Sequence, residues 1–582
     1  MKTTFTWKIG GEAGFGIKVS CMMFVRLCVR MGLHIFDYSE YPSLIRGGHN
    51  TYQVTVSPDE VFAELHEVDY LVALNEETVR LHLGELTKGA SIIYDPDVVH
   101  LDAAEFQQKE ISLIGVPLKK IVKEVGGPDI MRNMVAIGAT IALLCAELTE
   151  FEELIAEQFA KKGETIIGQN VDVVRRGYAY VQEKHKRECT HVLTKQEVKS
   201  KRMALTVNDA ISLGAVAAGC KFYAAYPMTP ASSVLETLAR WDTKAGIVVK
   251  HAEDEISVIN MALGASFAGV RSMIGTSGGG FSLMVETLGL AGITETPLVV
   301  LNSQRPGPAT GLPTWSGQGD LRFVMHAAQD DFPRIVLAPG DVDEAFALTR
   351  DAFRLAEKYH VPVIILSDKF LSESQKSTEP FDLGDENIAR ESMLTQEQIG
   401  ALTEKYKRYA LTESGVSPRT IPGMPGGVHL ANSDEHDEYG FTDETSEMRT
   451  AQHAKRMKKL EAIAKEIPAQ KMYGPESADL TLIAWGSTKG TVREAMRILE
   501  RENIHINFLH LSHLFPFPVD QVKRVMQNAK RTLLLEGNAA AQLGGLIQQF
   551  TLTVPDETFL KYDGRPFFPR EVVAKVKEIM SS

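Results

Sequence analysis

The sequence predicts a multidomain α/β protein whose central part is a doubly wound parallel sheet. Its 582 residues exceed a single domain of about 100–200 residues. From residue 205 to 366, short apolar strands alternate with helices of about 10–18 residues, the pattern of parallel β-α-β units. The composition, 44% hydrophobic and 24% charged, is that of an ordinary folded protein. We therefore expect several packed α/β domains.

Charge and composition exclude several classes of protein. The net charge of −13 argues against binding to nucleic acid or an anionic membrane. The longest apolar stretch, Met134–Ala146, is shorter than the ~20 residues of a membrane span, and the first residues lack a signal peptide's apolar core. Five cysteines without a CxxC pair argue against a disulfide framework, a zinc site or an iron–sulfur cluster held by this chain alone. We expect a cytoplasmic protein without its own metal.

The first domain is expected at 1–195. It opens with strand Phe5–Ile9, glycine loop Gly10–Gly16, helix Ile17–Met31 and strand Leu33–Phe36. The charged run Val181–Arg202 predicts a linker at its end. The other expected elements are strands 70–74 and 91–94 and helices 76–83, 134–148 and 151–161.

The second domain, at 196–375, contains the predicted parallel sheet. Ser233 and Glu236 form the sequence pattern of a capping box before a helix. The expected strands are 222–225, 247–249, 271–275, 298–302, 335–337 and 361–366. The expected helices are 208–218, 234–241, 256–267, 283–290 and 342–359.

The last two segments differ in character. Residues 376–470 contain proline- and glycine-rich turns, an acidic loop and a charged helix at 448–465, which is typical of a connector or arm. Residues 471–582 predict a third α/β unit, with strands 480–484, 504–511 and 531–535 and a helix at 491–500.

Polar residues follow four strands of the central domain. Thr229 lies between two prolines in YPMTPASS, and Glu255 follows HAED at the head of an apolar helix. The loop GTSGGGFSLM is rich in glycine, which allows a flat ring to approach the backbone. Arg305 is the lone cation of the next loop, Asn302–Asp320. Open parallel sheets bind ligands at the carboxyl ends of their strands, so the four loops predict a site for a cofactor and an anionic substrate.

Each feature taken singly has a common structural explanation. A threonine between prolines is usually a turn residue, and a glutamate at a helix start usually complements the helix dipole. A glycine-rich loop often binds phosphate or allows tight packing. The order and spacing of all four features together favour a functional site.

These motifs resemble the α subunit of the 2-oxoacid:ferredoxin oxidoreductases, which are thiamine-diphosphate enzymes. The matching strings are YPMTPASS, HAEDEISVINMALGASFAG, GTSGGGFSLM and QRPGPATGLPT. GGEAGFGIK and YPSLIRGGHN are similar to the family's γ domain, here fused in front of α. WGSTKG, LFPFP and LEGNAAAQLGG look like its transketolase-C-like domain. SLIRGGHN and TSGGGFSLM look most like the 2-oxoglutarate branch, which interconverts 2-oxoglutarate, CoA and oxidised ferredoxin with succinyl-CoA, CO2 and reduced ferredoxin.

The resemblance implies roles for individual residues. Glu255 is expected to bind and activate the thiamine ring, and Arg305 to bind the 2-oxo carboxylate as a planar bidentate partner. Thr229 is expected at the substrate end of the site. Arg46, with help from His49, is expected to contact the distal carboxylate. The other residues expected to bind the cofactor are Tyr226, Pro227, Ser277, Gly278, Gly279 and Phe281.

The features that are missing also carry information. The sequence has no motif for a Mg²⁺–diphosphate site of the GDG…N kind and no cysteines for a cluster. The resemblance assigns the Mg²⁺ and a [4Fe–4S] cluster to a β subunit. We therefore expect half an active site that works in an (αβ)2 assembly, with CoA as co-substrate and ferredoxin as electron partner.

Other functions remain open at this point. Pyruvate, branched-chain and indolepyruvate oxidoreductases are alternatives within the family. A nucleotide-binding or flavoprotein subunit is an alternative of another class, since Gly11, Gly14 and Gly16 lie between a strand and a helix and Asp37 follows. Their spacing departs from G-x-G-x-x-G, however. A scaffold that only binds partners would not need Thr229, Glu255 and Arg305 at adjacent strand ends.

Overall fold

The computed structural model describes residues 3–44, 47–185, 189–197, 201–384, 390 and 392–581. The chain forms two compact units. The N-terminal unit comprises residues 1–205, 374–380 and 568–574. The second unit comprises residues 206–373, 381–567 and 575–582.

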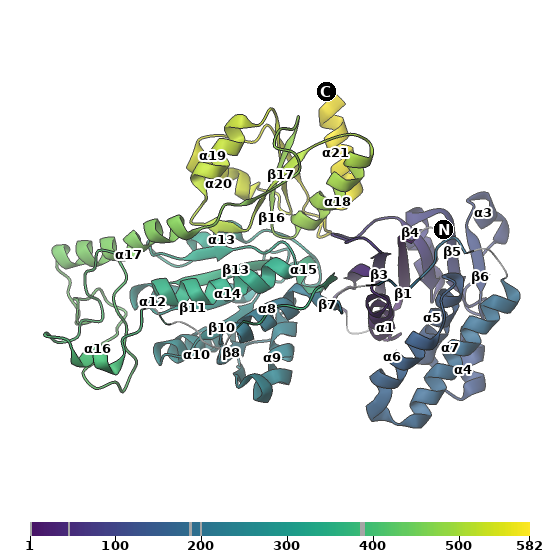
Figure 1. Cartoon of the computed structure of the whole chain (residues 1–582), viewed down its shortest axis with the longest axis horizontal. Helices are drawn as coiled ribbons and strands as arrows, with labels where there is room; N and C mark the ends of the chain where they lie inside the picture. The colour runs from purple at the N-terminus through teal and green to yellow at the C-terminus, as the bar shows by residue number, and fades with distance from the viewer. Residues whose placement is uncertain are drawn as a thin grey trace. The chain divides into compact units, whose positions relative to one another are not determined.

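An eight-stranded mixed sheet is the centre of the N-terminal unit (Figure 1). The strand order is β6-β5-β4-β1-β3-β2-β14-β7, with β1 antiparallel to β3 and parallel to β4. The strands are β1 (Phe5–Glu12), β2 (His34–Glu40), β3 (His49–Ser57), β4 (Val68–Ala73), β5 (Leu86–Tyr94), β6 (Ser112–Gly115), β7 (Met203–Thr206) and β14 (Gln375–Thr378).

Helices pack on this sheet over a continuous apolar core that includes Trp7 and Phe24. They are α1 (Ile17–Arg30), α2 (Glu76–His82), α3 (Ala103–Gln108), α4 (Leu118–Val125), α5 (Arg132–Leu143), α6 (Thr149–Phe159) and α7 (Glu164–Lys184). The helix α7 was not predicted, and it extends into the run expected as a linker. A Cβ on Gly138 of α5 would lie 2.2 Å from the Val174 carbonyl oxygen, and one on Gly177 of α7 would lie 2.2 Å from that of Val135. These glycines let the two helices touch backbone to backbone.

The glycine segment near the N-terminus is mostly strand. β1 continues through Glu12, so Gly10 and Gly11 lie within the sheet rather than in a loop. A Cβ on Gly10 would lie 2.6 Å from Thr78 Cγ2, and one on Gly11 would lie 2.9 Å from the Phe15 ring. Protein side chains fill the space over both glycines, which does not favour the nucleotide-binding alternative.

The second unit contains the predicted doubly wound sheet (Figure 1). Its order is β18-β12-β13-β11-β10-β8-β9, and all pairs are parallel except β18 with β12. The strands are β8 (Phe222–Ala225), β9 (Val248–His251), β10 (Ser272–Thr276), β11 (Leu298–Gln304), β12 (Ile335–Leu337), β13 (Pro362–Asp368) and β18 (His513–Phe515). The sequence-based prediction of the fold class is confirmed.

The helices of this sheet follow the predicted pattern with small shifts. They are α8 (Val207–Ala217), α9 (Ser232–Ala245), α10 (Glu255–Phe267), α11 (Gly278–Phe281), α12 (Val285–Ile293), α13 (Leu321–His326), α14 (Val342–Tyr359) and α15 (Lys369–Glu373). The capping box predicted at Ser233 is wrong. The N-cap of α9 is Ala231, and the Ser233 hydroxyl instead accepts a hydrogen bond of 2.8 Å from Asn208 Nδ2.

The segment predicted as an arm forms α16 (Gln396–Gly400) and α17 (Ser446–Glu466) between long irregular stretches. A buried carboxylate fixes it to the central sheet's domain. Glu295 Oε1 is 2.5 Å from Lys455 Nζ, and Glu295 Oε2 is 2.5 Å from Lys459 Nζ. The Arg408 guanidinium donates to the carbonyl oxygens of Thr294 and Glu295.

A five-stranded sheet of order β15-β17-β16-β19-β20 completes the second unit. Its strands are β15 (Lys471–Tyr473), β16 (Thr481–Trp485), β17 (Asn507–Leu511), β19 (Thr532–Glu536) and β20 (Glu557–Leu560). Its helices are α18 (Thr488–Arg501), α19 (Val519–Asn528) and α20 (Gln542–Thr551), and α21 (Pro569–Ser581) ends the chain. β18 leaves this segment to pair with β12, so one apolar core includes residues of both sheets.

Two features of the chain as a whole complete the description. Cys145 and Cys189 form a disulfide with their Cα atoms 6.2 Å apart, although the number and spacing of the cysteines argued against a disulfide framework; the two residues are 44 positions apart, so no local pattern marks the pair. None of the described helices is both long and apolar enough to span a membrane.

Candidate functional site

The four predicted loops follow β8, β9, β10 and β11, which are neighbours in the parallel sheet. Their carboxyl ends therefore lie at one edge, where open α/β sheets bind ligands. Arg305, directly after β11, reaches the loop after β8, since its Nη1 donates a hydrogen bond of 2.8 Å to the Thr229 carbonyl oxygen. The Thr229 hydroxyl has no hydrogen bond within the described chain. The structure thus brings Arg305 and Thr229 together.

Glu255 is the first residue of α10 and is only 5% exposed. The N-cap of this helix is Asp254, whose carboxylate accepts a hydrogen bond of 2.7 Å from the Ser257 backbone N–H. The Glu255 carboxyl is therefore not needed as the cap. Its Oε1 is buried and has no hydrogen-bond partner among the described residues. A buried unpaired carboxyl oxygen is costly, which points to a ligand group as its partner.

Only half of the apolar residues expected next to Glu255 are buried. Val258 and Ile259 are fully buried, whereas Ile256 and Met261 lie at the surface. The helix has therefore only one face in the core of this chain.

The glycine-rich loop is a short helix, α11, with Ser277 at its N-cap. Ser277 is fully buried, and its hydroxyl has no partner in the described structure. Phe281 is buried against the Phe323 ring, with centroids 5.2 Å apart. Of the residues predicted to bind the cofactor, Ser277 thus has a buried hydroxyl that is unpaired among the described residues, and Phe281 is part of the apolar core.

The three glycines of α11 face different surroundings. A Cβ on Gly280 would lie 2.2 Å from Thr276 Oγ1 and 2.7 Å from Glu255 Oε1, and one on Gly278 would lie 2.5 Å from Asp320 Oδ2. At Gly279 the nearest atom would be the Ala309 carbonyl oxygen at 3.9 Å. We expected the glycines to let a flat ring approach; the space is open at Gly279 alone, and carboxyl groups of the protein occupy it at the other two.

Sequence reasoning missed Asp320, which ends the loop that follows β11. Its Oδ2 accepts a hydrogen bond of 3.1 Å from Asn302 Nδ2, and its backbone N–H donates to Gln304 Oε1 at 3.0 Å. Burial raises the pKa of Asp320, while Asn302 and the positive charge of Arg305 act in the opposite direction. Burial also lowers the pKa of Arg305. Eighteen residues separate Asp320 from Asn302, so no short motif could reveal the contact.

The remaining predicted residues lie at two places. Tyr226 is half-exposed beside Pro227, with its ring edge-on to His251 at 6.3 Å between centroids. Arg46 lies outside the described residues. His49 lies at the start of β3 in the N-terminal unit.

His49 belongs to a chain of polar side chains. Its Nε2 is 2.8 Å from His82 Nε2, and His82 Nδ1 is 2.8 Å from Glu85 Oε1. Lys8 donates to Glu85 Oε2 at 2.5 Å. Burial, His82 and Lys8 lower the pKa of His49 to about 4. His49 is thus neutral near pH 7, and a substrate contact with it would be a hydrogen bond rather than an ion pair.

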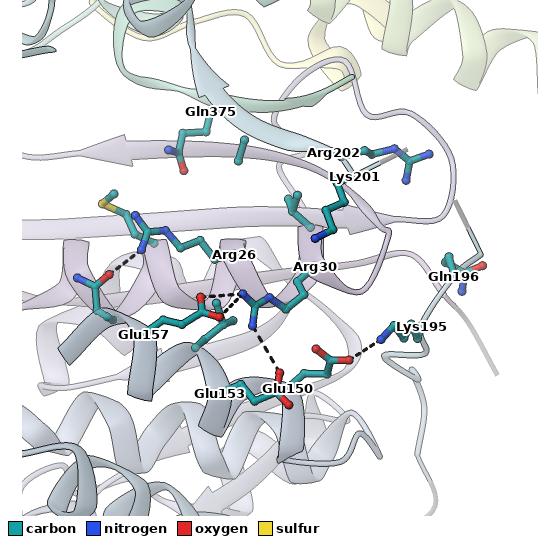
Figure 2. A pocket seen from close by; sticks show the side chains of 15 residues that line it. Arg26, Arg30, Glu150, Glu153, Glu157, Lys195, Gln196, Lys201, Arg202 and Gln375 are labelled. Carbon is teal, nitrogen blue, oxygen red and sulfur yellow. Dashed lines mark hydrogen bonds and ion pairs between the residues drawn. The ribbon is translucent and has the colours of Figure 1, made fainter. Parts of the chain in front are cut away.

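A cavity of about 960 Å³ lies elsewhere in the N-terminal unit (Figure 2). Arg30 points between Glu153 and Glu157, and Lys195 pairs with Glu150 at 2.5 Å. The cavity wall carries five basic and three acidic side chains, and it contains no residue of the predicted site. Among the described residues, no group of three or more His, Cys, Asp or Glu side chains is arranged to hold a metal ion.

Comparison with protein families gives three matches along the chain. Residues 213–456 match "Pyruvate flavodoxin/ferredoxin oxidoreductase, thiamine diP-bdg". Residues 6–180 match "Pyruvate ferredoxin/flavodoxin oxidoreductase", and residues 478–572 match "Pyruvate:ferredoxin oxidoreductase core domain II". The thiamine-binding model covers all four loops of the candidate site.

Individual proteins are similar over nearly the full length. The 2-oxoacid:ferredoxin oxidoreductase subunit alpha of a Sulfolobus species is 33% identical over 97% of this chain and 95% of that relative. The 2-oxoglutarate oxidoreductase subunit KorA of Mycobacterium tuberculosis is 29% identical over 88% of this chain and 82% of its own length. A solved 2-oxoglutarate:ferredoxin oxidoreductase from Magnetococcus marinus, with 2-oxoglutarate, coenzyme A and succinyl-CoA bound, superposes with a TM-score of 0.92, 33% identity and coverage of 99% and 100%.

Proposed function

Since the chain belongs to the family of 2-oxoacid:ferredoxin oxidoreductase α subunits, we propose that it interconverts 2-oxoglutarate, CoA and oxidised ferredoxin with succinyl-CoA, CO2 and reduced ferredoxin. It is an oxidoreductase and one subunit of a multi-subunit enzyme. The substrate is inferred from the 2-oxoglutarate, coenzyme A and succinyl-CoA named for the M. marinus enzyme. The observation that carries the thiamine chemistry is the buried, unpaired carboxyl oxygen of Glu255 beside the glycine loop.

The residues at the sheet edge fit an aminopyrimidine ring. Glu255 Oε1 and Ser277 Oγ are buried and have no hydrogen-bond partner among the residues that the structure describes, and the backbone at Gly279 is open to a flat group. Thiamine diphosphate would supply the carbon nucleophile and the electron sink for decarboxylation. Glu255 would hold a proton at its carboxyl oxygen against a ring nitrogen. Tyr226, Pro227 and Phe281 would flank that ring.

Arg305 and Thr229 would bind the 2-oxo acid end of the substrate. Arg305 uses one N–H of its guanidinium on the Thr229 carbonyl oxygen, which fixes the plane of the fork. The remaining N–H groups can donate to a carboxylate in a bidentate manner. The Thr229 hydroxyl, which makes no hydrogen bond to the described residues, would donate to the oxo or carboxylate oxygen.

To select 2-oxoglutarate, the enzyme would need a second group besides Arg305 that is positively charged or donates a hydrogen bond. A 2-oxoglutarate enzyme must compensate the distal carboxylate, because a buried unpaired charge costs several kcal/mol, on the order of 3–5. We assign this to Arg46, with His49 as a neutral hydrogen-bonding neighbour. Pyruvate or another 2-oxoacid remains the alternative substrate if Arg46 serves only to hold its loop.

The partner would complete the active site. We propose a β subunit that carries the Mg²⁺–diphosphate site and a [4Fe–4S] cluster, in an (αβ)2 complex in the cytoplasm. The ferredoxin would dock mainly on that subunit, because ferredoxins tend to be acidic and this chain carries a charge of −13. We also propose domain boundaries at 1–195, 196–375, 376–470 and 471–582.

Glu255→Gln in the complex coexpressed with its β subunit tests the thiamine proposal. We expect turnover to fall by about a hundredfold to ten-thousandfold, the usual contribution of a positioned acid–base group, while the complex stays assembled. Asp254→Asn is the matched control: asparagine is an equally good N-cap, so the adjacent charge is lost but turnover should remain near the wild-type value. Near-normal turnover of Glu255→Gln would contradict the assignment.

A further inference from the structure

Two carboxyl groups of the chain lie against the same short helix. Glu255 occupies the space that a side chain at Gly280 would need, and Asp320 occupies the corresponding space at Gly278. Between them, Gly279 has open space in front of its backbone. A flat group that approaches Gly279 would therefore have a carboxyl group available on each side, only one of which belongs to a motif of the sequence.

The Asp320 carboxylate has no structural role that uses both of its oxygens. It sits at the N-cap of α13, where aspartate normally accepts a hydrogen bond from the helix backbone, but its side chain makes no such bond. Its Oδ2 takes one hydrogen bond from Asn302. Within the described residues, its Oδ1 has no hydrogen bond and the carboxylate has no ion-pair partner. The fold thus holds this carboxylate in place by one oxygen and leaves the other free.

Unpaired groups around α11 provide independent evidence for a ligand. Ser277 Oγ, Glu255 Oε1 and Asn302 Oδ1 are all buried and have no hydrogen-bond partner in the part of the chain that the structure describes, and each belongs to a residue that is at most 5% exposed. Buried polar atoms are paired in nearly all folded proteins. Three unpaired atoms around one short helix point to a polar ligand that completes them.

We propose that Asp320 is a cofactor-binding residue whose carboxylate accepts a hydrogen bond from the exocyclic amine of the aminopyrimidine ring. The inference rests on the proposed thiamine function, and it adds a second carboxyl contact to the one assigned to Glu255. An aminopyrimidine carries its ring nitrogen and its amine on separate edges. The Asp320 carboxyl beside Gly278 and the Glu255 carboxyl beside Gly280 can therefore each form a hydrogen bond to one of them. A carboxylate is acceptor-only and suits an amine donor. Asn302 then acts as a positioning residue for Asp320.

The test is an equilibrium binding measurement on the apo complex of this chain with its β subunit. The probes are thiamine diphosphate and its 4′-deamino analogue, in which hydrogen replaces the exocyclic amine, and calorimetry gives the two dissociation constants. Asp320→Asn keeps an oxygen for Asn302 and presents an NH2 donor instead of an acceptor. Asp320→Ser keeps a good N-cap residue for α13, so it remains usable if the first variant folds poorly. Asp331→Asn, an exposed acid nearby in sequence, is the control.

In the wild-type complex, thiamine diphosphate should bind more tightly than the analogue. Both Asp320 variants should weaken binding of thiamine diphosphate by about tenfold to a hundredfold, as expected for a lost hydrogen bond to a charged group. They should leave binding of the analogue within threefold or so of wild type, and Asp331→Asn should change neither.

Three outcomes would overturn the role of Asp320: unchanged affinity for thiamine diphosphate in the variants, equal losses for both probes, or a wild-type complex that does not distinguish the probes. A wild-type complex that binds no thiamine diphosphate would instead contradict the proposed function itself. The two failures are therefore distinguishable.

Discussion

Replacement of Glu295 by glutamine should release residues 381–470, which make up most of the predicted arm, from the central domain. Glu295 is fully buried and is bridged at 2.5 Å to both Lys455 and Lys459, which are also buried. Burial alone would raise the pKa of Glu295, but the charges of Lys459, Lys455 and Arg408 outweigh it and hold the pKa well below its usual range. The carboxylate is therefore ionised, and Glu295→Gln leaves two buried ammonium groups without a counter-charge.

The size of the effect follows from that geometry. Removal of one partner from a buried ion pair costs about 3–5 kcal/mol, since an uncompensated charge stays buried. Since about 1.4 kcal/mol corresponds to a factor of ten in an equilibrium constant, the fraction of molecules in which the arm is open should rise by about two to three and a half powers of ten. The loss of stability should be largest for α17, because Lys455 and Lys459 both lie on this helix.

Limited proteolysis under native conditions measures this opening. The rate of cleavage within residues 401–445 should rise in Glu295→Gln by the factor given above, provided that cleavage tracks the open population. Asp479→Asn is the control, because the Asp479–Lys530 pair is exposed and should contribute nothing measurable. A cleavage rate within about threefold of wild type for Glu295→Gln would refute the reasoning.

Two further predictions concern the site and its pH dependence. Arg305→Lys keeps the charge but loses the planar fork, so KM for 2-oxoglutarate should rise by about tenfold in steady-state assays of the complex; an unchanged KM would contradict the carboxylate contact. Burial raises the pKa of Asp368 to about 6, above its unfolded value near 3.8, so this carboxyl makes the fold less stable as the pH rises from about 4 through 6. Asp368→Asn should remove that loss of stability. The difference between the unfolding midpoints of the variant and of wild type should therefore be more favourable to the variant at pH 7.5 than at pH 4.5. An identical difference at both pH values would disprove the raised pKa of Asp368.

The parallel sheet could be predicted because its signal is local. Helices such as α14 carry an apolar stripe of their own, and the strands between them are short and buried on both faces. The polar residues at the strand ends follow directly from that topology. Glu255, Thr229 and Arg305 could thus be predicted at one edge of the sheet from the sequence.

What could not be predicted depends on contacts between distant residues. The helix α7 was not predicted because Gly168 and Gly177 weaken its pattern, although Gly177 packs directly against the backbone of α5. The segment GGGF has poor helix propensity, yet it is helical as α11. Asp320 reaches the site through contacts with residues distant in sequence, its hydrogen bond from Asn302 and its position against Gly278. In all three cases tertiary packing overrides the local signal.

The strand β14 has a consequence for synthesis of the protein. It pairs antiparallel with β2, and Ser377 Oγ accepts a hydrogen bond of 3.1 Å from the Ile35 backbone N–H across more than 340 residues. A ribosome that has made only the first 200 residues has therefore produced a sheet whose β2 edge is still unpaired. Such an edge is a template for association with other chains. The nascent chain must keep this edge protected until residue 378 emerges, so a gene cut at the end of the first domain would leave it permanently open.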